Sequence, residues 1–74
     1  MYEKIKAILV EEMSINAKDI SPETEFMNDL GFNSLELADL IVICEERFDV
    51  TFDESALPSL VTVEDVVNYI EQNA

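Results

Sequence analysis

The sequence predicts an all-α fold, a small four-helix bundle with three longer helices, one short helix and a long loop between helices one and two. One glycine and two prolines in 74 residues leave few points at which a helix must stop. Apolar residues make up 49% of the chain and recur at helical spacing. Because a mean hydropathy of +0.09 is high enough to close a core, we expect residues 1–74 to form a single domain.

The first helix is expected from Tyr2 to about Ser14. Its charged residues point outward, and its apolar residues share one face. The residues expected on this core-facing side are Ile5, Ile8, Leu9 and Met13.

A long loop is expected from Ile15 to Phe32, where Ser21, Pro22 and Thr24 supply turn chemistry. The residues expected to anchor this loop to the core are Ile20, Phe26 and Leu30. Compact domains rarely keep a loop of about 15 residues unless the loop is functional. We therefore expect the function of the protein to lie near the end of this loop.

The second helix is expected to begin at Ser34 and to run to about Phe48. Gly31 supplies the turn before it. Asn33 is a good N-cap, and Glu36 stands three residues later, in the arrangement of a capping box.

This helix has two different faces when its residues are plotted at about 100° per residue. The face expected in the core holds Leu37, Leu40, Ile41, Cys44 and Phe48. The face on the side of Ser34, which we call the docking face, holds Leu35, Ala38, Asp39, Val42, Glu45 and Glu46. Small apolar side chains ringed by carboxylates are typical of a transient docking surface for basic partners, because charge steers the encounter and apolar contact fixes it.

Two further residues of the second helix lie off the docking face. Cys44 is expected to be a buried, unreactive thiol, because it falls in the middle of the core stripe. Arg47 interrupts the acidic run at the end of the helix, and we expect it to pair with Glu36 or in the neighbourhood of Ile43.

The third helix is expected to be short, beginning after Asp53, covering Glu54 to Leu57 and ending near Pro58. The fourth is expected to begin with a capping box formed by Thr62 and Asp65. The apolar stripe of this fourth helix consists of Val63, Val66, Val67 and Ile70.

The charge of the chain excludes several functions. Residues 19–74 hold fourteen acidic residues and one basic residue, Arg47, and they carry the whole net charge of −13. Because nucleic acids and anionic membrane surfaces would repel this chain, we expect partners to be basic proteins. With no apolar run of about 20 residues and no signal-like start, we expect a cytoplasmic monomer that does not enter a membrane.

The size and composition of the chain also argue against an enzyme. A domain of this length has little room for a deep cleft lined with catalytic groups. With one cysteine, Cys44, and no histidine, we expect no disulfide, no metal site and no Cys/His nucleophile.

The run Asp29-Leu30-Gly31-Phe32-Asn33-Ser34-Leu35, followed by an acidic amphipathic helix and a closing helix at Thr62-Val63-Glu64-Asp65, resembles the acyl carrier proteins. The resemblance covers essentially the whole chain. It implies that Ser34 is esterified by the phosphate of 4′-phosphopantetheine, which a phosphopantetheinyl transferase takes from coenzyme A. It also implies a carrier without catalytic residues, which moves acyl thioesters between the enzymes of fatty acid biosynthesis.

The resemblance further implies partners with basic docking patches, namely acyl synthases, transferases and reductases, and a core that can open to shelter an acyl chain. Two positions depart from the family pattern. Asn33 replaces the usual Asp before the serine, which removes a charge that the transferase reads. Phe32 replaces the small residue that is common in fatty-acid carriers, and in this respect the chain is similar to discrete polyketide carriers. A carrier for a polyketide or other specialised pathway therefore stays an alternative. An unmodified acidic interaction or inhibitor protein is an alternative of another class.

Overall fold

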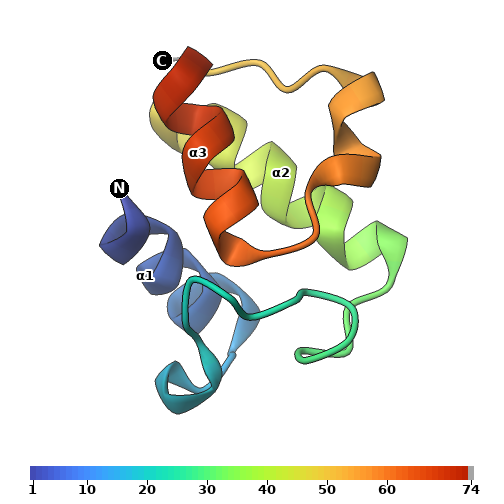
Figure 1. The fold of residues 1–74 in the computed structure, drawn as a ribbon. Helices are drawn as coiled ribbons and strands as arrows, with labels where there is room; N and C mark the ends of the chain where they lie inside the picture. The colour runs from blue at the N-terminus through green and yellow to red at the C-terminus, as the bar shows by residue number, and fades with distance from the viewer. Residues whose placement is uncertain (74) are drawn as a thin grey trace.

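The computed structural model describes residues 1–73 and confirms the all-α prediction. The longer helices are α1 (Tyr2–Met13), α2 (Ser34–Phe48) and α3 (Val63–Asn73), and two 3₁₀-helices, η1 (Ala17–Asp19) and η2 (Glu54–Ser59), lie between them (Figure 1). The three longer helices and the short helix η2 begin where the sequence predicted. The single turn η1 was not predicted.

The short helix η2 ends at Ser59, one residue after Pro58, which agrees with the predicted end near Pro58. The proline removes one backbone donor, but neighbouring groups complete the turn. The hydroxyl of Ser59 donates to the carbonyl of Ala56 (2.7 Å), and the N–H of Leu60 donates to the carbonyl of Leu57 (3.1 Å).

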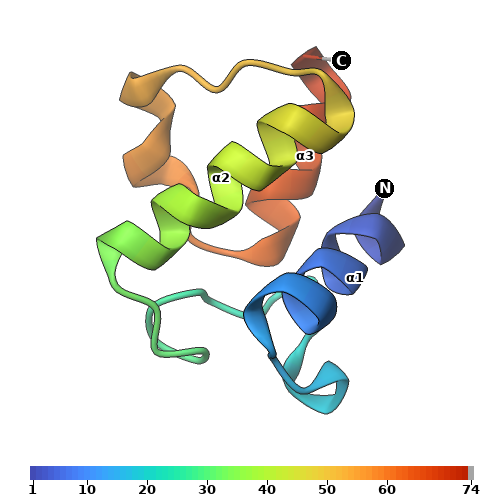
Figure 2. The ribbon, with the colours of Figure 1, turned by 180° about the vertical axis from the view of Figure 1, so that it is seen from behind.

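The helices are arranged around α2. Helices α1 and α3 are in contact with each other, and η2 lies near the first half of α2, on the side away from α1 (Figures 1 and 2). Both views place the two ends of the described chain far from η2. The molecule therefore has a side built by α1 and α3 and an opposite side built by η2 and the start of α2.

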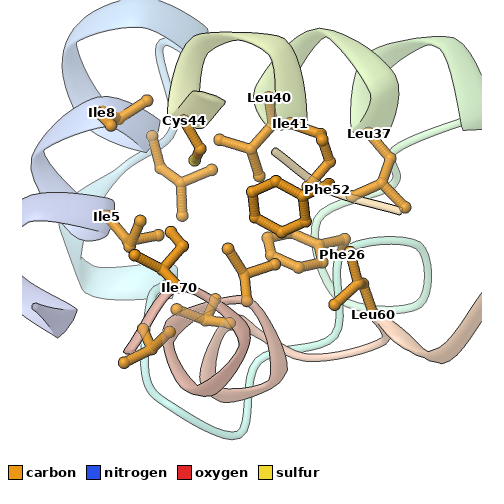
Figure 3. Packing of buried hydrophobic residues seen from close by; sticks show 14 of the residues in the cluster. Ile5, Ile8, Phe26, Leu37, Leu40, Ile41, Cys44, Phe52, Leu60 and Ile70 are labelled. Atoms are coloured by element: carbon orange, nitrogen blue, oxygen red, sulfur yellow. The ribbon is translucent and has the colours of Figure 1, made fainter. Parts of the chain in front are cut away.

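The core lies between the three α-helices, where the predicted apolar stripes meet (Figure 3). The buried helical residues are Ile5, Ile8, Leu9, Leu37, Leu40, Ile41, Cys44, Val63, Val66, Val67 and Ile70. Met13 and Phe48, also predicted on these stripes, are half-buried and pack against the edge of the core. Helix η2 contributes no buried residue.

The loop before α2 is anchored as predicted. Ile20 and Phe26 are buried, and Leu30 is half-buried against the core. The loop also pairs with the segment that precedes α3, because the N–H of Phe26 donates to the carbonyl of Val61 (3.0 Å) and the N–H of Val63 donates to that of Thr24 (3.0 Å). These bonds fix the path of the chain toward Ser34.

Candidate functional site at the start of α2

The start of α2 is built by local hydrogen bonds that the sequence predicted. The side-chain oxygen of Asn33 accepts from the N–H of Glu36 (2.9 Å), and the Glu36 carboxylate accepts from the N–H of Asn33 (3.1 Å), which completes the capping box. Gly31 has a φ of 71°, in the left-handed region that favours glycine. The turn and the cap together make Ser34 the first residue of the helix.

Ser34 is exposed and lies beside unused hydrogen-bond donors. Within residues 1–73, the backbone N–H groups of Ser34 and Leu35 have no acceptor. These donors and the helix dipole favour an anion at this position by about 0.3–1 kcal/mol. A phosphodiester on the Ser34 hydroxyl would therefore be stabilised by the helix itself.

An apolar hollow of about 230 Å³ opens directly beside Ser34. Its lining residues are Met27, Ser34, Leu37, Ala38, Leu57 and Pro58. A second hollow of about 240 Å³ shares Met27, Leu37, Leu57 and Pro58 and extends to Val61. The hollow was not predicted, because its residues from the loop and from η2 follow no periodic pattern in the sequence. The one available signal was Met27, a large apolar residue in a polar turn, which is 51% exposed in the structure.

The docking face is open to solvent over most of its length. Leu35 is 76% exposed and Val42 is 51% exposed, and Ala38, Asp39 and Glu46 are exposed as well. The sixth residue, Glu45, is different. It is half-buried, and its Oε2 atom accepts a hydrogen bond from the backbone N–H of Phe52 (2.8 Å).

Arg47 pairs with Glu12 of α1 (3.7 Å), a partner that the sequence did not predict, and the expected pairing with Glu36 was wrong. Eleven residues along one helix separate Arg47 from Glu36 by roughly 16 Å, which a side chain cannot span. Both members of the observed pair are about half exposed, so the contact adds little to stability.

Cys44 is a core residue, as predicted. Its side chain is fully buried, and burial, together with the nearby charge of Glu45, raises the pKa of the thiol to about 12. The thiol therefore stays protonated and unreactive at neutral pH. Within residues 1–73, no cluster of three or more His, Cys, Asp or Glu residues could hold a metal ion, and no helix is long and apolar enough to cross a membrane.

Comparison with known proteins assigns the family. A family model described as a phosphopantetheine attachment site matches residues 3–70. The chain belongs to the acyl carrier protein family. Acyl carrier proteins from two strains of Helicobacter pylori are 38% and 40% identical over 73 residues, which is 99% of this chain and 94% of theirs. That of Helicobacter hepaticus is 38% identical over 72 residues, 97% of this chain and 95% of its own.

As a member of this family, the protein is an acyl carrier and not a catalyst, and it bears a covalently attached 4′-phosphopantetheine. Acyl carrier proteins work with synthase enzymes and with a phosphopantetheinyl transferase. The start of α2 fits such a group, because an exposed hydroxyl, two open N–H groups and an apolar hollow occur together. When bound, the group supplies a terminal thiol that forms thioesters, so the protein needs no general base beside Ser34.

Proposed function

We propose that the arm is attached at Ser34 and that the protein carries acyl intermediates between the enzymes of fatty acid biosynthesis. The observation that carries this proposal is the position of Ser34, which is exposed at the capped start of α2 beside two free N–H groups. The adjoining hollow offers apolar surface to whatever the arm carries.

The other serines are poorer attachment sites. Ser14 lies at the C-terminal end of α1 with a φ of 58°, where the helix dipole repels a phosphate. Ser21 is half-buried, and its hydroxyl is bonded to that of Thr24 (3.1 Å). An acceptor of phosphopantetheine must be reachable by a separate enzyme, which favours the exposed Ser34 over the half-buried Ser21.

Two serines of η2 are also disfavoured. The hydroxyl of Ser59 already donates to the carbonyl of Ala56 (2.7 Å). Ser55 is exposed, but its backbone N–H is taken by the carboxylate of Asp53 (3.0 Å), which places a negative charge where a phosphate would lie. Among the serines of residues 1–73, Ser34 alone combines exposure at the start of an α-helix with free backbone donors.

Recognition by partners is proposed to use the docking face. Leu35 and Val42 give apolar contact, and the exposed carboxylates of Asp39 and Glu46 attract basic patches. The net charge of −13 strengthens this steering over longer range. The expected partners are the loading transferase and the synthase, transferase and reductase enzymes of the pathway.

Phe32 has a structural role that accounts for its size. Its side chain is buried, and its ring stacks on that of Phe26 with centroids 5.8 Å apart. Because packing explains this residue, Phe32 gives no support to a polyketide pathway over fatty acid synthesis.

The proposal is tested by loading the protein with coenzyme A and a broad-specificity transferase, followed by mass spectrometry and fragmentation. We expect one adduct, on Ser34, and none on a Ser34→Ala variant that keeps its helical circular dichroism. No adduct, or an adduct on another serine, would contradict the attachment site. The pathway is tested separately by supplying the loaded protein to reconstituted fatty acid elongation enzymes, where failure to elongate would contradict the pathway but not the carrier role.

A further inference from the structure

The C-terminal end of α2 is closed by three hydrogen bonds to one residue, Glu45. Its carbonyl accepts from the N–H of Asp49, which has a φ of 53°, and from the N–H of Val50 (3.3 Å). Its carboxylate Oε2 accepts from the N–H of Phe52 (2.8 Å). The chain that leaves α2 is therefore turned back and held against the helix.

The held segment is also tied to α3. The side chain of Phe52 points into the core (Figure 3), and its ring stacks on that of Tyr69 with centroids 4.5 Å apart. The Tyr69 hydroxyl accepts from the N–H of Asp53 (2.9 Å). Asp53 is the N-cap of η2, so these contacts set the point from which η2 begins.

Helix η2 has little packing of its own to hold it in place. None of its residues is buried, and its half-buried Leu57 lines the hollow beside Ser34. The same Leu57 lines a third hollow, of about 230 Å³, whose wall includes Glu45 and Phe52. The position of η2 over the start of α2 therefore depends on how its two ends are attached.

We propose that Glu45 is a positioning residue whose carboxylate, bonded to the N–H of Phe52, holds η2 against α2 and keeps Leu57 in the wall of the hollow beside Ser34. This role differs from that of the other carboxylates of the docking face, which are exposed and free to meet a partner. We call the hydrogen bond between the Glu45 carboxylate and the N–H of Phe52 the latch, and it is present in the unmodified chain. Its consequence for an acyl group rests on the proposed attachment at Ser34.

The consequence concerns hydrolysis of the bound thioester. Water adds to the thioester carbonyl and the carbon–sulfur bond breaks, which gives a free acid and returns the thiol of the arm. An acyl group packed against Leu57 in the apolar hollow meets less water than one on the surface. Releasing η2 from α2 is therefore expected to speed hydrolysis of the thioester.

The test compares three variants, Glu45→Ala, Glu45→Gln and Glu46→Ala. All three remove one negative charge from neighbouring positions of α2, but only Glu45→Ala removes the acceptor for the N–H of Phe52, because the glutamine amide oxygen can still accept. Hydrogen exchange of single amides is measured by NMR on the unmodified proteins. We expect exchange at Phe52 to be about tenfold faster in Glu45→Ala and close to wild type in the other two.

Exchange in α1, for example at Leu9, is the internal reference. Faster exchange at Phe52 with unchanged exchange at Leu9 supports a local latch. Equal acceleration at both amides would mean a global loss of stability and would overturn the proposal. The proposal would also be overturned if Glu45→Gln exchanged as fast as Glu45→Ala, or if Glu45→Ala behaved like Glu46→Ala.

The second measurement uses the loaded protein with a medium-length acyl group. We expect thioester hydrolysis to be several times faster in Glu45→Ala than in wild type, Glu45→Gln or Glu46→Ala. Equal hydrolysis in all four proteins would overturn the role in sheltering. If loading itself fails at Ser34, the proposed function fails, whereas the exchange experiment still decides whether Glu45 acts as a latch.

Discussion

The two sides of α2 differ in how they are packed. The side that faces α1 and α3 meets continuous apolar stripes, and the residues at its centre, such as Leu40 and Cys44, are fully buried. The side near η2 meets half-buried Leu57 and exposed Pro58, and it is hollowed next to Ser34. The first side supplies most of the stability of the fold, and the second is more loosely packed.

The difference follows from the sequence of the elements that cover each side. Helix α3 has four buried residues at helical spacing, whereas η2 is a six-residue 3₁₀-helix that contains Pro58. Short 3₁₀-helices have poorer hydrogen-bond geometry than α-helices and bury less surface. Segments with few buried contacts open at a lower free energy than the global unfolding of the domain.

Two alanine substitutions, one on each side of α2, test this difference, and they include the largest change in the free energy of unfolding that we expect. Ile70 of α3 is fully buried, so Ile70→Ala is expected to lower the free energy of unfolding by about 2–5 kcal/mol. That loss is a large fraction of the roughly 4–11 kcal/mol expected for a domain of this size. Leu57→Ala, in η2, is expected to cost less than about 1.5 kcal/mol, because Leu57 is only half-buried. Denaturant titration followed by circular dichroism measures both.

Equal losses of stability in Ile70→Ala and Leu57→Ala would contradict the proposed difference in packing between the two sides of α2. Such a result would mean that η2 is part of the cooperative core and does not open separately. A sharper form of the comparison measures exchange in Leu57→Ala, where amides of η2 are expected to respond and those of α1 are not.

A second prediction compares charges on the two sides. Reversing Asp39 and Glu46 to Lys places two positive charges on the docking face, and reversing Glu3 and Glu11 to Lys makes the same change of net charge on α1. All four residues are exposed, so both variants are expected to fold. Association with the loading transferase is expected to slow about tenfold or more for the first variant at low salt, and much less for the second.

Added salt is the control for this prediction. Screening should reduce the difference in association rate between the two variants, because steering by exposed charges weakens as ionic strength rises. Glu12 is left unchanged because it pairs with Arg47. Equal slowing of both variants would show that net charge, and not the docking face, controls the encounter.

The features that could be predicted from the sequence are those encoded by neighbouring residues. The capping boxes at Asn33 and Thr62 and the apolar stripes of the helices are local patterns, and each was confirmed in the structure. Ser34 was placed at the helix start for the same reason. Its proposed role as an attachment point rests on the resemblance to a family, because a serine at a helix start usually serves only as a cap.

The features that could not be predicted depend on residues far apart in the chain. The hollow beside Ser34 joins Met27 of the loop to Leu57 of η2, and no spacing rule connects them. The hydrogen bond from the N–H of Phe52 to Glu45 forms across the end of α2. The geometry of the turn after α2 determines which backbone N–H group comes close to the Glu45 carboxylate. A helical plot places Glu45 on the docking face but does not show that the following segment will cover it.

The smallest expected effect concerns the N-cap of η2. Hydrogen bonds from Ser55, above all from its backbone N–H, hold the pKa of Asp53 below its ordinary value. A lowered pKa in the folded state means that the charged cap stabilises η2 above the ordinary Asp range, near roughly pH 4, and that this contribution is lost as pH falls through the folded pKa. The effect is expected to be small, because Asp53 is fully exposed.

The measurement is the chemical shift of the Ser55 amide in NMR spectra recorded as the pH is lowered. In the wild type this shift is expected to change with a midpoint below the ordinary pKa of Asp, since it reports protonation of the carboxylate that accepts its hydrogen bond. Asp53→Asn keeps an uncharged cap, so the same amide should show no such transition. If the transition persists in Asp53→Asn, another carboxylate is responsible and the cap does not set the pH response of η2. If the transition is present only in the wild type while amides of α1 stay unchanged, η2 responds to acid separately from the packed side of α2, as the contrast between the two sides requires.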